Sequence, residues 1–269
     1  MYVTAIVLAA GKGSRLGLKV SKPLVEINSQ PIIVYCLKIF SRHPYVKDII
    51  VVINSKNSKS IINKIKQYRI SKIRHIVKGG LRRQDSVLCG LRAIDSRSDL
   101  VLIHDSARPF LSHRLVSSVI AEAKRSKAAI AGVPVKATIK KVTRSVRKPP
   151  RRGQSHPSTW FGCAHHKSLG AGKVTSKFEV KETLNREDLW EVQTPQVFSK
   201  DLILKAYKKY ASNIQVTDDA MLVEKLGVKV SIVRGSYNNI KITTPEDLLI
   251  AQAIAKTKSS KLKVKNRSF

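Results

Sequence analysis

The chain has 269 residues, of which 51 are Lys or Arg and 18 are Asp or Glu, so its formal charge is +33. Its hydrophobic content of 42% is ordinary for a globular protein that buries a core. Its three cysteines do not make a disulfide framework, and no apolar run approaches the roughly 20 residues of a membrane-spanning helix. No cationic region precedes the first apolar run, so we expect no signal peptide, no membrane partner and a cytoplasmic location.

The positive charge favours polyanions as partners, but part of it lies in two runs that contain no acid. Eight Lys or Arg and no acid occupy residues 144–177, and six with no acid occupy 256–267. Such runs are typical of solvated or disordered segments. Aromatic residues are not interleaved with them, which argues against a base-stacking surface. We therefore expect nucleic acid to bind only non-specifically, by electrostatic attraction.

Apolar runs of strand length alternate along the chain with segments of helical periodicity. The expected strands are 3–10, 46–53, 70–77, 100–105, 128–135, 191–198, 228–233 and 239–242, and the expected helices are 31–40, 58–69, 87–94, 115–127, 202–210, 220–226 and 244–255. Thr217, Asp218 and Asp219 are predicted to cap the helix that follows them, and Thr244 with Asp247 forms a capping box. Alternation of this kind predicts an α/β fold with a mostly parallel sheet.

The first predicted strand runs into a loop rich in glycine and cations, Gly11-Lys-Gly13-Ser-Arg15-Leu-Gly17. Glycine allows backbone N–H groups to approach a ligand, so this loop is a candidate cradle for a polyphosphate. The glycine spacing matches neither the dinucleotide fingerprint nor the P-loop. An ordinary strand-to-helix turn stays open as the alternative.

Two further polar loops, 79–86 and 104–108, also follow predicted strands. Ligands of parallel sheets bind beyond the carboxyl ends of the strands, so we expect the three loops to meet there.

Five blocks in order make the resemblance specific: LAAGKGSRLG, GGLRRQDSVLCGL, HDSARPF, the pair NREDLW and QTPQVF, and NNIKITTPEDL. With these blocks the chain resembles the 2-C-methyl-D-erythritol 4-phosphate cytidylyltransferases of the non-mevalonate isoprenoid pathway. The resemblance implies a Rossmann-like twisted sheet with helices on both faces and a protruding β-arm that exchanges between the subunits of a homodimer. It also implies transfer of CMP from CTP to a polyol phosphate with release of pyrophosphate, and a Mg²⁺ cofactor.

The resemblance assigns roles to individual residues. Arg15, Lys22 and Lys241 are implied to be catalytic, and Asp105 is implied to hold the metal. The residues implied to bind CTP are Ala9, Ala10, Gly11, Gly13, Ser14, Gly79, Gly80, Ser86, Asp105 and Ala107. Those implied to bind the second substrate are Arg108, Thr138, Arg186 and Thr194. Arg83 and Asp85 are left as structural candidates.

Residues 1–255 are expected to form one nucleotidylyltransferase domain with an arm at about 136–190, a basic insertion at about 143–178 and a disordered basic tail at 256–269. One departure from the family is Ala137, which stands where its motif V-x-D-T has an aspartate. Ribitol 5-phosphate is therefore an alternative acceptor, and an impaired enzyme that binds nucleic acid is a second alternative.

Overall fold

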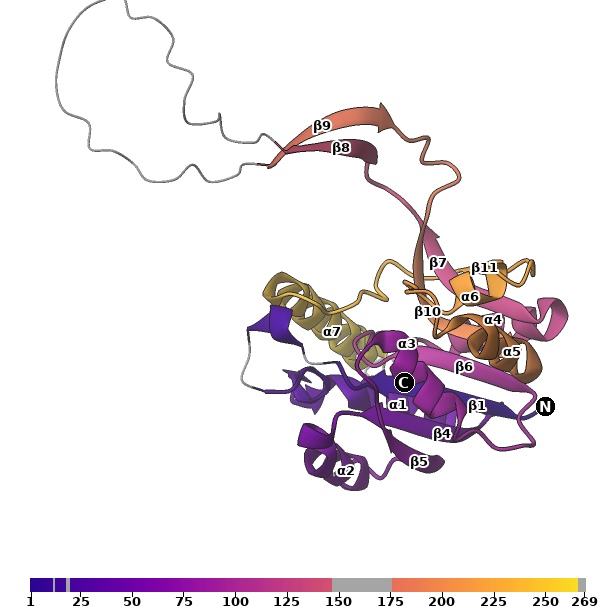
Figure 1. Ribbon diagram of the computed structural model, residues 1–269. Helices are drawn as coiled ribbons and strands as arrows, with labels where there is room; N and C mark the ends of the chain where they lie inside the picture. Colours follow the sequence, from indigo (N-terminus) through magenta and orange to yellow (C-terminus); the bar gives the residue numbers. More distant parts are fainter. Residues whose placement is uncertain (12, 18–19, 147–175, 266–269) are drawn as a thin grey trace, which may run out of the picture. The chain divides into compact units, whose positions relative to one another are not determined.

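A computed structural model describes residues 1–11, 13–17, 20–146 and 176–265. The chain forms two compact units (Figure 1), one made of Met1–Val133 with Glu191–Phe269 and the other of Pro134–Trp190. The second unit begins within two residues of the predicted arm and ends at the same residue. In the described residues no helix combines the length and the apolar character needed to cross a membrane.

The first unit is built on a seven-stranded sheet in the order β11-β7-β10-β6-β1-β4-β5. Its strands are β1 (Val3–Ala9), β4 (Val46–Ile53), β5 (Ile73–Lys78), β6 (Leu100–Asp105), β7 (Ala128–Pro134), β10 (Trp190–Ser199) and β11 (Ser231–Arg234). β1 pairs in parallel with both β4 and β6, β4 pairs in parallel with β5, and β7 with β11. β10 runs antiparallel to β6. The predicted mostly parallel α/β sheet is confirmed.

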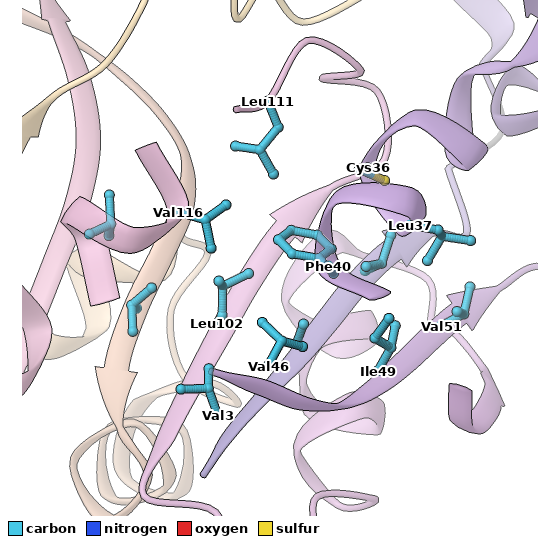
Figure 2. Close-up of a cluster of buried hydrophobic side chains, with 14 of the residues drawn as sticks. Val3, Cys36, Leu37, Phe40, Val46, Ile49, Val51, Leu102, Leu111 and Val116 are labelled. Atoms are coloured by element: carbon cyan, nitrogen blue, oxygen red, sulfur yellow. The ribbon is translucent and has the colours of Figure 1, made fainter. Parts of the chain in front are cut away.

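Helices cover both faces of this sheet because its central strands are apolar on both sides. Val3, Ala5 and Val7 of β1 belong to one buried cluster, and Ile6 belongs to another. The helices of the first cluster (Figure 2) are α1 (Ile32–Arg42), α2 (Ser58–Gln67) and α4 (His113–Ser126). Those of the second are α3 (Arg83–Leu91), α5 (Lys200–Tyr210) and α6 (Ala220–Glu224). Cys36 and Cys89, on α1 and α3, are free thiols.

A third apolar cluster packs the last helix against the segment after the first loop. α7 (Pro245–Lys265) contributes Ala251 and Ala255, which are grouped with Leu16 and Ile27. Short elements fill this segment: the 3₁₀ helices η1 (Ser14–Leu16) and η2 (Lys22–Leu24) and the strands β2 (Glu26–Ile27) and β3 (Gln30–Pro31). Elsewhere, a third 3₁₀ helix, η3 (Ser55–Asn57), precedes α2. This packing anchors the chain at Leu16, the residue after Arg15.

The second unit contains a two-stranded antiparallel hairpin of β8 (Lys140–Val146) and β9 (Ser176–Thr183). Val142 pairs with Val180 and Arg144 pairs with Phe178. The predicted insertion at 143–178 therefore begins and ends in paired strand, and the part between the two strands lies outside the described residues.

Several predicted boundaries were wrong. No strand forms at 239–242, where the Ile242 N–H donates instead to the Ala107 carbonyl at 2.9 Å. α3 starts four residues earlier than predicted, because Asp85 accepts from the Arg82 N–H at 3.0 Å and caps its first turn. β11 starts three residues later and ends one later than predicted, and α7 continues from the predicted end at 255 to Lys265. The capping box of α7 is confirmed, since Thr244 N–H donates to Asp247 at 2.9 Å.

Candidate active site

The carboxyl ends of β1, β5 and β6 bring the three predicted loops together. A Cβ at Gly79, just after β5, would lie 2.6 Å from the Ala10 Cβ and 2.7 Å from the Ser86 Oγ. The Ser106 N–H, just after β6, donates to the Leu8 carbonyl of β1 at 3.0 Å. Glycine at 79 therefore allows contact between loops that are about seventy residues apart in the sequence.

The first loop folds back so that its glycine meets the lysine of η2. Gly13 has a φ of +67°, and a Cβ there would lie 2.7 Å from the Lys22 Cβ. The Asn57 amide donates to the Ser21 hydroxyl at 2.6 Å and braces the residue before Lys22. The loop thereby sets the position of Lys22, while Arg15 in η1 stays exposed to solvent.

Burial, together with the charges of Lys241 and Arg15, lowers the pKa of Lys22 to about 8 against the opposing effect of Asp105. Like charges raise the free energy of the protonated lysine when they are held close together. These cations therefore form a site where an anion would relieve repulsion, as the sequence predicted.

Asp105 is the carboxylate at the centre of this charge cluster. Its Oδ2 lies 2.6 Å from the Lys241 Nζ, and its Oδ1 lies 3.2 Å from the Arg83 Nε. Burial would raise the pKa of Asp105, but the charges of Arg83 and Lys241 outweigh burial and hold the pKa well below its usual range. Asp105 is therefore ionised and fixes the Lys241 ammonium at the mouth of the site.

Arg83 connects Asp105 to a second, fully buried carboxylate. Its guanidinium donates two hydrogen bonds to Asp219, at 3.0 and 2.9 Å, and Asp219 also accepts from the Tyr207 hydroxyl at 2.6 Å. Despite burial, Asp219 and Asp105 raise the pKa of Arg83, so its charge is permanent. This paired arginine ties α3 to both β6 and the start of α6.

A cavity of about 630 Å³ opens beside Asp105. It is lined on the polar side by Arg83, Asp105, Arg108, Thr194 and Lys241. The lining also includes the apolar Ile130, Val192, Met221, Val230 and Ile232 and the polar Gln193, Gln196, Thr217, Asp218 and Glu224. The predicted residues Asp105, Arg108, Thr194 and Lys241 are therefore together.

Arg108 is almost buried and is held by main-chain oxygens. Its Nη1 donates to the Asn239 carbonyl at 2.7 Å, and its Nη2 donates to the Val192 carbonyl at 3.2 Å. Its Nε has no hydrogen-bond partner. Because an unpaired buried donor is costly, a ligand that accepts from Nε would stabilise this arrangement.

Thr138 and Arg186 belong to the second unit. Both are exposed, and the Arg186 Nη1 donates to the Lys136 carbonyl at 2.8 Å. Their predicted part in the substrate site stays a prediction.

Sequence reasoning missed four residues of this site. Arg83 was left as a structural candidate, Asp219 was taken for a helix cap, Tyr207 was not singled out, and His104 was noted in the 104–108 loop but given no role of its own. In the structure it is Asp218 that caps α6, by accepting from the Met221 N–H at 3.1 Å, while Asp219 turns inward. The available signal was the pair of adjacent acids, of which only one is needed as a cap.

A family model described as 2-C-methyl-D-erythritol 4-phosphate cytidylyltransferase matches residues 3–155 and 171–257. A curated relative of that name from Alkaliphilus oremlandii is 40% identical over 260 residues, which cover 95% of each chain. A relative of the same name from Clostridioides difficile is 39% identical over 259 residues, covering 94% of this chain and 93% of the relative.

Solved structures of similar proteins share the fold. A structure described as 4-diphosphocytidyl-2C-methyl-D-erythritol synthase from Anaerococcus prevotii has 32% identity and a TM-score of 0.74, covering 95% of this chain and 96% of its own. The structure of a 2-C-methyl-D-erythritol 4-phosphate cytidylyltransferase from Thermus thermophilus has 27% identity and a TM-score of 0.67, covering 95% of this chain and all of its own.

Replacing Arg83 with methionine is expected to destabilise the fold by about 3–5 kcal/mol, because it leaves Asp219 charged and buried without its partner. Urea unfolding measures the loss. Arg82→Met is the matched control, since the exposed Arg82 pairs with Asp85 at the surface and should cost less than about 1 kcal/mol. Adding Asp219→Asn to Arg83→Met should restore part of the stability. Equal costs for the two single variants would contradict this account.

Binding of inorganic tripolyphosphate is expected to weaken as the pH rises above 8. Lys22 is charged below its pKa of about 8 and loses that charge above it, and an anion prefers the charged form. The dissociation constant should rise by up to about tenfold per pH unit between pH 8 and 9.5, with proton uptake on binding, both measured by calorimetry. Lys22→Arg, which stays charged, should flatten the profile. A wild-type profile as flat as that of the variant would refute the role given to Lys22.

Proposed function

The chain belongs to the 2-C-methyl-D-erythritol 4-phosphate cytidylyltransferase family, and we propose that it transfers CMP from CTP to 2-C-methyl-D-erythritol 4-phosphate in isoprenoid precursor synthesis. One observation supports this proposal above the others: Lys241, from the loop before α7, binds the ionised Asp105, and Lys22 of η2 lies within the fields of both of them and of Arg15. Two anionic substrates can approach one another only where such charges neutralise them.

The reaction joins an oxygen of the acceptor phosphate to the α-phosphorus of CTP and breaks the bond from that phosphorus to the bridging oxygen, releasing pyrophosphate. No covalent enzyme intermediate is required. The protein therefore has to align the two anions in line and stabilise the charge that builds on the α-phosphate. We assign this stabilisation to Arg15 and Lys22, with Lys241 beside them and the N–H groups of the first loop on the triphosphate.

Selection of the cytosine base is assigned to the loop after β5. Gly79 and Gly80 leave backbone groups accessible, and a carbonyl there would accept from the cytosine amino group and reject uracil. Ser86, whose hydroxyl donates to the Arg82 carbonyl at 3.2 Å, lies on the same side of this loop. Ala9, Ala10, Gly11, Ser14 and Ala107 complete the assigned CTP site.

Mg²⁺ is assigned to the nucleotide, with Asp105 as its protein ligand. Asp105 is ionised, but each of its oxygens already accepts from a cation, and the described residues include no group of three potential metal ligands. One carboxylate fits an ion that takes most of its ligands from phosphates and water. When bound, the ion would neutralise phosphate charge.

The acceptor is assigned to Arg108 and Thr194 at the cavity and to Thr138 and Arg186 of the second unit. A planar guanidinium suits a phosphate through paired hydrogen bonds, and the unpartnered Arg108 Nε provides one donor. Because Ala137 stands where the family motif has an aspartate, ribitol 5-phosphate is the acceptor to compare.

Purified protein with CTP and Mg²⁺ is expected to release pyrophosphate when 2-C-methyl-D-erythritol 4-phosphate is added, and at least tenfold more slowly with ribitol 5-phosphate. Lys22→Gln and Arg15→Gln should each lower kcat by about 100-fold or more, the usual effect of removing a charge-stabilising group. Lys59→Gln, on the surface of α2, is the matched control and should change nothing. Unaltered transfer in the Lys22 and Arg15 variants would sink the assignment.

The nucleic-acid alternative makes a different prediction for the same preparation. Binding of single-stranded DNA that weakens steeply with salt, together with no pyrophosphate release from either acceptor, would favour it.

We also propose a homodimer built through the hairpin of the second unit. Val142, Phe178 and Val180 are exposed by 48%, 62% and 62% on paired positions of β8 and β9, and a patch of this kind usually meets a partner. Sedimentation should give the mass of a dimer, and serine at all three positions should give a folded monomer. A wild-type monomer at micromolar concentration would contradict the proposal.

A further inference from the structure

His104, the residue before Asp105 on β6, is fully buried and has a partner on each ring nitrogen. Its Nε2 lies 3.1 Å from the Arg108 carbonyl oxygen, and its Nδ1 lies 3.0 Å from the Thr194 Oγ1. One edge of the ring also meets Phe40 of α1, with ring centroids 5.4 Å apart. The imidazole thus has little freedom to turn.

The two partners fix which nitrogen carries the proton. A carbonyl oxygen only accepts, so Nε2 must be the N–H that donates to Arg108. The ring is fully buried, and its two hydrogen-bond partners, a carbonyl and a hydroxyl, are uncharged. A charged imidazole buried without a paired carboxylate would be costly, so the ring is neutral and Nδ1 keeps a lone pair. The Thr194 hydroxyl must therefore donate its proton to Nδ1.

The direction of this hydrogen bond determines which other partners the Thr194 hydroxyl can bind. Its oxygen also accepts from the Asp105 N–H at 3.2 Å. The ladder between β6 and β10 ends at the pair Ile103 and Gln196, and the next residue of β10, Pro195, has no N–H. Beyond the pair Ile103 and Gln196, the Thr194 side chain connects β10 to the main chain of Asp105 in place of a backbone hydrogen bond.

The other bond holds Arg108. The Arg108 N–H donates to the Asp105 carbonyl at 3.0 Å, and its own carbonyl accepts from His104. One imidazole thereby closes the turn from 104 to 108 and connects it to β10. Both Asp105, which binds Lys241, and Arg108, which lines the cavity, are attached to this turn.

We infer that His104 is a positioning residue of the site, held as the neutral Nε2–H tautomer, and that it acts by orienting the Thr194 hydroxyl and the 104–108 turn. The expected effect of His104 on the reaction rate rests on the proposed cytidylyl transfer. Thr194 then has no proton left to donate to an acceptor phosphate, so its contribution to the acceptor site is the position it gives to Asp105.

The tautomer is measurable without turnover. Long-range proton–nitrogen NMR spectra of histidine-labelled wild-type protein at pH 7 should show His104 protonated at Nε2 and unprotonated at Nδ1, with the signals assigned from their loss in His104→Asn. A protonated Nδ1, or a mixture of both forms, overturns the inference. This readout stands whether or not the chain transfers CMP, so a wild-type protein without turnover would remove the proposed function alone.

Kinetics then separate positioning from general stability. His104→Phe is expected to lower kcat at least tenfold with CTP affinity unchanged within threefold, whereas His113→Phe, at an exposed histidine of α4, should leave both unchanged. His104→Asn keeps an acceptor near the Nδ1 position, and His104→Gln keeps a donor near Nε2, so each should recover part of the lost rate.

A double-mutant cycle tests the link to Thr194. Thr194→Val should lower kcat, and adding it to His104→Phe should lower the rate by no more than a further twofold, because both changes break the same connection. Losses that multiply would show that the two residues act independently and would overturn the inference.

Discussion

The site depends on holding several cations close together against their mutual electrostatic repulsion. Asp105 holds two of these cations, because its oxygens bind Lys241 and Arg83, which lie far apart in the sequence. A single carboxylate cannot neutralise Lys22 and Arg15 as well. Burial is the largest cause of the fall in the pKa of Lys22 to about 8, and the charges of Lys241 and Arg15 add to it. The free energy of this unrelieved repulsion is what an anionic substrate removes on binding. The same arrangement explains why the loop is rich in glycine: Gly13 has no Cβ to keep Lys22 away.

The topology of the sheet makes this concentration of charge possible. β1 lies between β6 and β4, so the loops after β1 and β6 are neighbours, and Gly79 brings the loop after β5 against Ala10. The antiparallel β10 adds a different element, because it enters beside β6 and places Thr194 next to Asp105. The loop before α7 supplies Lys241 through the bond from Ile242 to Ala107. Parallel strands collect the loops at one edge, and these two later segments fix the side chains within it.

Much of the fold follows from the sequence, and the reasons differ from element to element. β4 and β6 were predicted to the residue because runs such as VKDIIVVI are buried on both faces and end at polar residues. The strand predicted at 239–242 failed because a short apolar pattern cannot reveal that its N–H groups meet a loop. Within the site, glycine and lysine spacing identified the loops that converge. Asp219 and His104 were missed because their function depends on burial and on partners far away in the sequence: 136 residues for Asp219 with Arg83 and 90 for His104 with Thr194. Local pattern indicates which loops meet, and long-range pairing decides which side chains are held there.

The large net charge and the local charge cluster act at different distances. Within the cluster, Asp105 and Asp219 are buried and paired, so salt screens their ion pairs much less than pairs on the surface. The exposed lysines and arginines of the described residues lie in solvent, where salt screens them within about 10 Å. Such a field raises the rate at which anions arrive, but it cannot align an acceptor oxygen with a phosphorus atom. Alignment needs side chains that cannot move, and in this chain their immobility comes from buried pairs: Arg83 with Asp219, and His104 with Thr194.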